Sequence, residues 1–298
     1  RSIVEKGSEI MGKRIDRMLY PDGKSRALTF SYDDGVVQDR RLVAILNQYG
    51  MKGTFNLNYG YLGFQGTQEM NGRMVDISKI AKEEVPVLYQ GHEVAGHGMW
   101  HSLLPTIESG AAMWEIIEDK YQLEKISPNI LKSFAYPFGE TNSSVCEILR
   151  LAGYEGARTV KSTYCFELPE NFLMWHPTCH HGDPRLMELA KAFCEEPVHP
   201  LSPAKLFYVW GHAYEFDADD NWNVIERLTE YLSAFSDQIW FATNGEIMDY
   251  VHAYQGLQYS ADACRIHNPY ATDVWMSISG KVYQIPAGET VRIQDPGI

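Results

Sequence analysis

Short apolar runs alternate with longer amphipathic segments between about residues 27 and 254. The runs have the length of buried strands, and the segments between them repeat apolar residues at helical spacing. The strand-like runs are Ala27–Tyr32, Gly53–Asn56, Glu93–Ala95, Ser133–Tyr136, Gly156–Thr159, Leu206–Trp210 and Ile239–Ala242. The helix-like segments include Arg40–Gln48, Met113–Ile126, Ser144–Ala152, Arg185–Phe193 and Trp222–Phe235. Because this alternation is typical of βα units, we predict an α/β fold, a distorted (β/α)7 barrel, over residues 26–255.

Residues 256–298 follow a different pattern. Three segments there alternate apolar and polar positions and are separated by glycine-containing turns: Thr272–Ser279, Lys281–Ile285 and Glu289–Ile293. They predict a small C-terminal antiparallel β appendage. The appendage has no cluster of chemically useful residues, so a lid or brace for the barrel is the simpler interpretation, and a sugar-binding edge is the alternative. We treat residues 1–25 as an N-terminal leader segment.

The net charge is −13, and the 26 Lys and Arg residues are scattered along the chain. Nucleic acid and anionic membranes are therefore poor partners, because both attract clustered positive charge. No run approaches the roughly 18 apolar residues of a membrane span. The five cysteines form no C-x-x-C pair, which favours reduced thiols and a cytoplasmic location for the sequence as it begins at Arg1. Oligomerisation is left open.

The acidic and histidine residues that are candidates for a functional site follow the predicted strands directly. They are Asp33, Asp34, His97, His101 and His212. Barrel enzymes assemble their sites from the loops at the carboxyl ends of the strands. A single fold of this class would therefore bring these side chains together.

Asp33 and Asp34 end the first strand-like run and precede Gly35. Adjacent strand residues point in opposite directions, so the two carboxylates are expected to do different work. One could bind a metal while the other faces a reacting water. On its own, an Asp-Asp-Gly sequence is more often a solvated turn.

His97 and His101 are spaced i, i+4, so a helical turn would bring both imidazoles to one point. Two imidazoles and one carboxylate leave metal positions open for water and substrate. Zinc is the default ion for these ligands, and cobalt, nickel or manganese would also fit. The zinc-protease motif H-E-x-x-H is absent, because Gly98 follows His97. His92 and Glu93 are expected to support the ligands or to pack.

His212 ends the buried run that begins at Leu206. A histidine with a pKa near neutrality can protonate a leaving amine or alkoxide. A structural histidine that is satisfied by its neighbours is the alternative.

The order of these elements resembles the polysaccharide deacetylases of the NodB-homology type, carbohydrate esterase family four. The family motif T-F-D-D-G resembles the segment from Thr29 to Gly35, and H-[ST]-x-x-H resembles His97 to His101. The motif R-x-P-x-G resembles Ala135 to Gly139, and the strand that ends in histidine resembles Val209 to His212. The resemblance covers roughly residues 26–251.

The resemblance implies a role for each matched residue. Asp33 would be the general base, His212 the general acid, and Asp34 a metal ligand together with His97 and His101. Trp210 would line the acetyl pocket. A backbone N–H in the turn that contains Tyr136, Pro137 and Phe138 would bind the oxyanion, which places these three residues beside the substrate.

Two departures from the family pattern matter. Gly98 replaces the usual hydroxyl residue, so a hydrogen bond in the metal loop is lost. The arginine of R-x-P-x-G is absent, although in the family it orients the catalytic aspartate. Arg158, at the next strand end, is placed to substitute, and we predict that it pairs with Asp33; a surface arginine is the alternative.

His180 and His181 lie in a histidine-rich segment without a counterpart in the family motifs. We predict that they contact the substrate, and a polar loop is the alternative. Taken together, the sequence predicts a metal-dependent hydrolase that removes N- or O-linked acetyl groups from a carbohydrate. The alternatives are a deacylase of a small N-acyl or cyclic amide metabolite and a non-catalytic carbohydrate-binding barrel.

Overall fold

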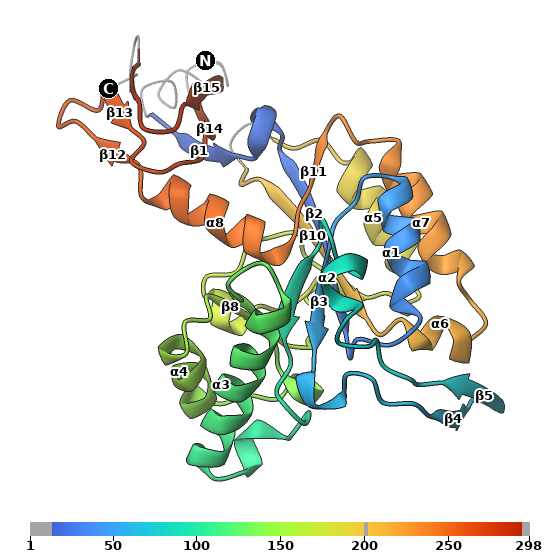
Figure 1. The fold of residues 1–298 in the computed structure, drawn as a ribbon. Helices are drawn as coiled ribbons and strands as arrows, with labels where there is room; N and C mark the ends of the chain where they lie inside the picture. The colour runs from blue at the N-terminus through green and yellow to red at the C-terminus, as the bar shows by residue number, and fades with distance from the viewer. Residues whose placement is uncertain (1–13, 200–201, 294–298) are drawn as a thin grey trace, which may run out of the picture.

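A curled sheet of parallel strands forms the centre of the molecule (Figure 1). The computed structural model describes residues 14–199 and 202–293. The spatial order of the strands is β8 (Gly156–Arg158), β7 (Ser133–Ala135), β6 (Glu93–Gly96), β3 (Gly53–Leu57), β2 (Arg26–Asp33), β10 (Lys205–Gly211) and β9 (Cys179–His180), with β11 (Ile239–Phe241) also paired to β2. Every pairing in this sheet is parallel. The predicted α/β, barrel-like fold class is confirmed.

β2 is the longest strand of the described sheet in which every residue is buried. It pairs with β10 along one edge, and with β11 and then β3 along the other. The segment around Trp175 forms a parallel bridge to Arg158, and β9 then pairs with β10. This segment links the two ends of the curled sheet, so the carboxyl ends of the strands face a common space.

Helices surround the sheet (Figure 1). The predicted helices are α1 (Asp39–Gln48), α3 (Ser109–Ile126), α4 (Ser143–Leu151), α5 (Leu186–Glu195) and α7 (Asn223–Ser233), joined by the shorter α2 (Val85–Leu88) and α6 (Tyr214–Ala218). A further helix, α8 (Asn244–Gln255), was not predicted. Thr243 and Glu246 cap its N-terminus reciprocally. None of the helices in the described ranges is both long and apolar enough to cross a membrane.

The C-terminal residues form the predicted antiparallel strands, and the N-terminal segment joins them. β1 (Asp16–Leu19) pairs with β14 (Val274–Ile278), which pairs with β15 (Lys281–Ile285). β13 (Arg265–His267) pairs with β12 (Gln258–Tyr259) and β16 (Thr290–Arg292). Part of the expected leader is therefore a strand of the appendage. Since β1 leads into the amino end of β2, the appendage lies at the end of the barrel opposite the strand carboxyl ends (Figure 1).

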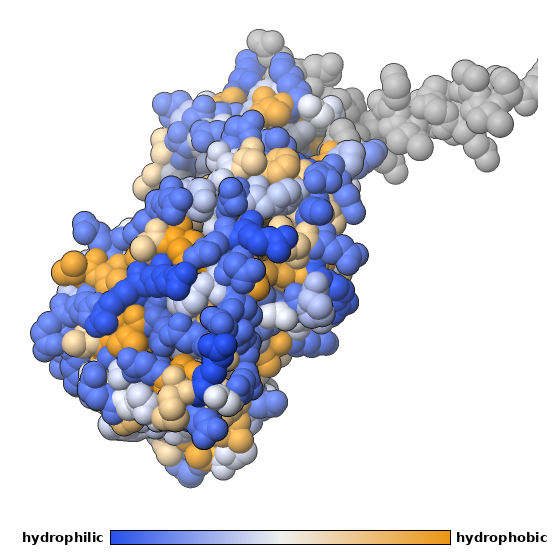
Figure 2. Space-filling model, turned by 90° about the vertical axis from the view of Figure 1, so that its right-hand side faces the viewer, coloured by the Kyte–Doolittle hydropathy of each residue, from blue (hydrophilic) through white to orange (hydrophobic). Residues whose placement is uncertain are grey.

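One element near the strand carboxyl ends was not predicted. β4 (Thr67–Met70) and β5 (Arg73–Asp76) form an antiparallel hairpin that projects from the body of the molecule (Figure 1). Most of its side chains are exposed, so it carries little of the apolar alternation that would mark a strand in the sequence. On the face that Figure 2 shows, apolar residues lie in separate patches among hydrophilic ones.

Candidate active site

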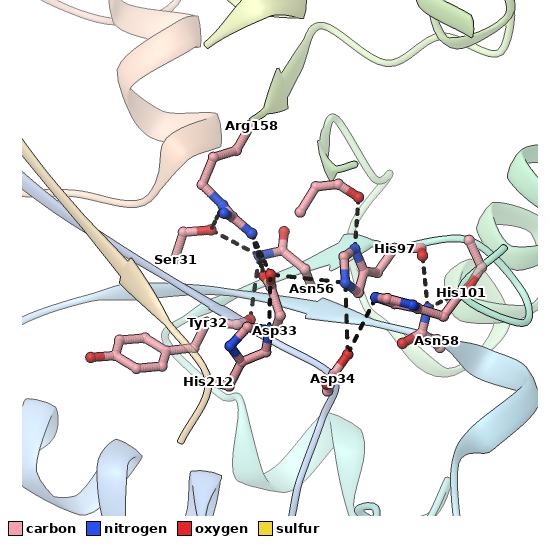
Figure 3. Close-up of polar contacts among 12 residues, drawn as sticks. Ser31, Tyr32, Asp33, Asp34, Asn56, Asn58, His97, His101, Arg158 and His212 are labelled. Atoms are coloured by element: carbon pink, nitrogen blue, oxygen red, sulfur yellow. Dashed lines mark hydrogen bonds and ion pairs between the residues drawn. The ribbon is translucent and has the colours of Figure 1, made fainter. Parts of the chain in front are cut away.

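The first two site residues lie where β2 ends. Asp33 is its last residue and is buried, and Asp34 follows with a left-handed φ of 79°. The Asp34 N–H still donates to Asn56 O at 2.9 Å, so the chain leaves the sheet only after Asp34. The two carboxylates share His97 as a neighbour but otherwise have different partners (Figure 3). Asp33 is bound by Arg158 and lies near His212, whereas Asp34 faces His101 and Lys79.

Asp34, His97 and His101 bring three potential metal-ligating atoms together (Figure 3). His97 Nε2 lies 3.7 Å from Asp34 Oδ1, and His101 Nε2 lies 3.9 Å from the same oxygen. These separations leave space for one cation between the three atoms.

The hydrogen bonding of His97 fits a metal ligand. Its Nδ1 lies 2.7 Å from Ala135 O, so Nδ1 donates the hydrogen bond and Nε2 keeps a free lone pair. Nε2 is buried and, within the described ranges, has no hydrogen-bond partner. Burial also lowers the pKa of His97 to about 4, so the ring is neutral, as a ligand must be. The residues present therefore fit a divalent cation.

The segment from His97 to His101 is a loop rather than the helical turn that the spacing predicts. Gly98 and His101 have φ values of 79° and 55°, which a right-handed helix does not allow. The two imidazoles still meet, with ring centroids 4.6 Å apart and an edge-to-face arrangement. The prediction of convergence is confirmed, and the helical reason for it is wrong.

α3 anchors this loop through two buried carboxylates. Asp119 Oδ2 accepts a hydrogen bond from His97 N at 3.1 Å, and Glu115 Oε2 accepts one from Trp100 N at 2.9 Å. Gly98 lies between them in a conformation that favours glycine. The hydrogen bonds to Glu115 and Asp119 therefore hold the loop without a hydroxyl at position 98.

The predicted pairing of Arg158 with Asp33 is confirmed. Arg158 Nη2 donates to the two Asp33 oxygens at 2.6 and 2.5 Å, and Asn56 Nδ2 donates to Asp33 Oδ1 at 2.8 Å. Burial alone would raise the pKa of Asp33, but the charge and hydrogen bond of Arg158, together with the nearby imidazoles of His97 and His212, outweigh burial and hold that pKa at about 2. Trp210 stacks on the guanidinium, with Cζ 4.3 Å from the ring centroid. Arg158 is fully buried, so the surface alternative is wrong.

His212 lies between two carboxylates. Its Nε2 is 3.8 Å from Asp33 Oδ2, and its Nδ1 is 3.3 Å from Glu215 Oε1. Burial alone would lower the pKa of His212, but Glu215 and Asp33 raise it to about 9. The imidazole is therefore protonated at neutral pH, as a proton donor must be.

Sequence reasoning missed Glu215. It lies in α6, three residues after His212, and its carboxylate also accepts from His212 N at 3.0 Å. The i, i+3 spacing from a candidate catalytic histidine was the available signal. Its closeness to His180 depends on the pairing of β9 with β10, which the sequence pattern did not reveal.

His180, His212 and Glu215 form a second group of potential metal ligands, but its hydrogen bonding does not fit a cation. His180 Nδ1 accepts from Gly182 N at 3.0 Å, so the proton of the neutral ring lies on Nε2. That nitrogen lies 3.0 Å from Glu215 Oε2 and donates to it, which leaves no lone pair for a metal. In His97, by contrast, Nδ1 carries the proton, so the lone pair of Nε2 is available to a cation.

The side chains of Tyr136, Pro137 and His181 are buried, so these side chains do not offer a surface to a substrate. The role that the resemblance implies for the turn needs only a backbone N–H, and the burial of Tyr136 and Pro137 does not contradict it. The Tyr136 hydroxyl donates to Leu173 O at 2.7 Å. The His181 ring stacks on Tyr32 and Phe216, with centroid separations of 5.6 and 4.2 Å. These side chains support the site from within the core.

Phe138 and His180 remain candidates for side-chain contact with the substrate, whereas the side chain of Trp210 is buried as well. Phe138 is 59% exposed and meets His101 edge to face at 4.6 Å, and the ring of His180 lies 4.7 Å from that of Trp210. In the turn η5 (Pro137–Gly139), the N–H groups of residues 136 and 139 have backbone acceptors. The Phe138 N–H has none in the described part of the chain.

His92 and Glu93 pack strands together and do not support the metal ligands. They lie at the start of β6, whereas His97 follows its end. His92 Nδ1 accepts from Gly53 N at 3.0 Å, and Glu93 accepts from Thr54 Oγ1 at 2.7 Å. The packing interpretation therefore holds.

Residues 20–157 match a protein family described as polysaccharide deacetylase. This segment includes Asp33, Asp34, His97 and His101 and ends just before Arg158. The match confirms the resemblance that the motifs predict. No curated protein matches the chain.

Several solved structures are similar to the chain. A putative polysaccharide deacetylase from Mycobacterium smegmatis aligns with a TM-score of 0.57 at 16% identity, over 80% of this chain and 94% of that one, which shows a shared fold. The Streptococcus pyogenes deacetylase PplD in complex with acetate is 19% identical, with a TM-score of 0.39, over 44% of this chain and 55% of its own length. A CE4 family pseudoenzyme from Bacillus anthracis is 18% identical, with a TM-score of 0.46, over 78% and 68%.

Proposed function

We propose that this chain, which matches the polysaccharide deacetylases over residues 20–157, is a metal-dependent hydrolase that removes acetyl groups from a carbohydrate. The observation that carries the proposal is the arrangement around adjacent carboxylates. Asp34 faces two imidazoles whose nitrogens suit a cation, while Asp33 faces an arginine and a protonated imidazole. The three ligands, the base and the acid thus meet in one place.

Asp34, His97 and His101 would hold the metal, and zinc is the ion that this donor set favours, with cobalt, nickel or manganese as alternatives. When bound, a divalent ion lowers the pKa of water and polarises a carbonyl group. The tautomer of His97, fixed by Ala135 O, is the one that such an ion needs.

Asp33 would accept the proton as water attacks the acetyl carbonyl. It is ionised at neutral pH because Arg158, with His97 and His212, holds its pKa low. The bond from Arg158 also keeps the carboxylate in one orientation, with its Oδ2 between His97 and His212. A fixed base and a fixed acid lower the entropic cost of reaching the transition state.

His212 would return a proton to the leaving nitrogen or oxygen, because it is protonated at neutral pH and lies on the Asp33 side of the site. The Phe138 N–H, which has no acceptor in the described part of the chain, is placed to donate to the negative oxygen of the tetrahedral intermediate. The family resemblance assigns this role to the same turn.

The two alternative functions would require different features of the structure. A non-catalytic barrel has no need for the buried Asp33–Arg158 pair, which places a charge in the core only at a cost. A deacylase for small N-acyl or cyclic amide metabolites would favour a closed pocket. The appendage that could have closed it lies at the other end of the barrel.

Acetate release tests the proposal. The zinc- or cobalt-loaded protein is incubated with acetylated chito-, xylo- and peptidoglycan oligosaccharides and, in parallel, with small N-acyl and cyclic amides. Release from at least one oligosaccharide is expected. Turnover of only the small amides supports the metabolite alternative, and the absence of turnover with every compound supports the non-catalytic one.

A further inference from the structure

An open cavity of about 420 Å3 begins at Asp34 and His101. This volume lies within the range of roughly 300–1,000 Å3 that ligand sites typically have. From the two candidate metal ligands the cavity extends to the β4–β5 hairpin, where Gln68 and Met70 line it. A ligand whose acetyl group lies at the metal ligands would therefore reach into this cavity with the rest of its structure.

Four aromatic side chains line the cavity and are exposed. Tyr61 is 37% exposed, Phe64 48%, Trp100 45% and Phe138 59%. Exposed aromatic rings gathered around one cavity indicate a surface for a ligand, because single exposed rings are common but grouped ones are not. A pyranose ring offers a matching shape: its C–H face can cover an aromatic ring while its hydroxyl groups stay hydrated.

Trp100 is held in place before any ligand binds. Gly60 lets the backbone approach the indole, since a Cβ at position 60 would lie 2.7 Å from Trp100 Cε3. Tyr61 meets the indole edge to face, with ring centroids 5.4 Å apart. The backbone N–H of Trp100 donates to the Glu115 carboxylate. A ring that is already ordered costs less side-chain entropy on binding.

The hairpin side of the cavity is also anchored. Asn71 Nδ2 donates to Asp219 Oδ1 at 2.7 Å, and Arg73 Nη2 lies 2.9 Å from Asp220 Oδ2. These contacts join the tip of the hairpin to the connection between α6 and α7. The pairs are exposed, so each contributes little stability, but together they hold the hairpin beside the site.

We propose that Tyr61, Phe64, Trp100 and Phe138 form an aromatic subsite for the pyranose residue joined to the acetylated sugar. The substrate class is then an oligosaccharide or polysaccharide, and not a small N-acyl metabolite. This inference rests on the proposed function, because the position of the subsite is defined by the candidate metal ligands.

The test compares Trp100→Ala with Trp114→Ala, a matched variant on α3 whose indole is 50% exposed and does not line the cavity. The readout is the ratio of kcat/KM for acetate release from oligosaccharides to that from the corresponding monosaccharide. We expect Trp100→Ala to lower this ratio about tenfold and Trp114→Ala to leave it unchanged. Equal ratios in the two variants would overturn the subsite.

A binding measurement separates this inference from the proposed function. Acetylated chito-, xylo- and peptidoglycan oligosaccharides are titrated calorimetrically into Asp33→Asn protein, with and without Trp100→Ala. Binding that weakens about tenfold without the indole supports the subsite even if the wild type releases no acetate, a result that would overturn only the proposed function. Binding that is absent, or unaffected by Trp100→Ala, overturns the subsite even if acetate is released.

Discussion

Asp33 lies beside the arginine that we propose to orient it and the histidine that we propose as the acid. Its Oδ2 lies 2.5 Å from Arg158 Nη2 and 3.8 Å from His212 Nε2. The carboxylate is buried, so its charge depends on these partners. The orientation of the Asp33 carboxylate should therefore depend on the shape of the Arg158 side chain as well as on its positive charge.

Arg158→Lys tests this dependence on shape. Lysine keeps the positive charge but lacks the planar guanidinium that meets both Asp33 oxygens and stacks on Trp210. We expect kcat/KM for acetate release to fall roughly 100-fold, because a misplaced base costs about that much. Zinc affinity, measured by titration, should stay within a few-fold of the wild-type value. Wild-type turnover in the variant would contradict the proposed orienting role.

Glu215→Gln tests the control of the proposed acid. Glu215 helps to raise the pKa of His212 to about 9, so the imidazolium is present below that pH and is lost as the pH rises through it. Removing the carboxylate charge lowers the pKa of His212, and we expect the alkaline limb of the kcat/KM profile to move down by about one pH unit or more. The zinc-loaded variant is compared with the wild type, and an unmoved alkaline limb would exclude Glu215 from this role.

The pairing of Arg158 with Asp33 could be predicted because each residue ends a strand of one sheet, whose carboxyl ends meet. The contact between Glu215 and His180 could not, since His180 comes from a two-residue strand without a recognisable pattern. The buried position of His181 was equally hidden. It depends on stacking with Tyr32 and Phe216, which are distant in sequence.

At the scale of elements, α3 does more than cover the sheet. Its buried residues Glu115 and Asp119 bind the backbone of the loop that carries His97. Asp119 also accepts from Tyr59 N at 2.8 Å, so one carboxylate ties the loop after β3 to the loop after β6. The position of a candidate metal ligand thus depends on a helix that contributes no candidate ligand.

Asp119→Asn tests this support. Tyr59 N and His97 N donate to different oxygens of Asp119, and an amide replaces one of these oxygens with an NH2 group that cannot accept, so one of the two hydrogen bonds is lost in this geometry. We expect zinc affinity to fall by roughly 10–100-fold, as is usual when a group that orients a ligand is lost. The titration is run above the pKa of Asp119, which burial raises to about 7. Glu118→Gln on the same helix is the matched control, and equal affinities in the two variants would contradict the account.

Apart from β9, the strands of the parallel sheet in the described residues were predicted to within about one residue, because each is a short apolar run with clear boundaries. The His97–His101 loop was predicted as a helical turn, because i, i+4 spacing alone does not report the positive φ of Gly98. The β4–β5 hairpin was missed, since an exposed hairpin needs no apolar face.

At the scale of the whole molecule, the two ends of the barrel have separate tasks. The strand carboxyl ends carry the site, and the appendage covers the other end with its own core, which includes Met276, Ile285 and residues of α8. The pairing of β1 with β14 could not be predicted from local patterns, because the two strands are separated by most of the chain. The sequence did predict that residues 256–298 form antiparallel strands.

Met276→Ala tests this separation. Met276 is fully buried in the core of the appendage, so the free energy of unfolding is expected to fall by about 2–5 kcal/mol. At a temperature where the variant is still folded, kcat/KM for acetate release should equal that of the wild type. Chemical denaturation and steady-state kinetics supply the two numbers, and a tenfold loss of kcat/KM in the folded variant would show that the appendage acts on the site.

The central claim is that adjacent carboxylates have divided roles, with Asp34 holding a cation and Asp33 facing the reacting water. Calorimetric titration of zinc into metal-free wild type, Asp33→Asn and Asp34→Asn protein tests this most directly. The account predicts one zinc ion per chain in the wild type and in Asp33→Asn, and at least a tenfold loss of affinity in Asp34→Asn. Equal zinc binding by the two variants, or loss of binding only in Asp33→Asn, would contradict it.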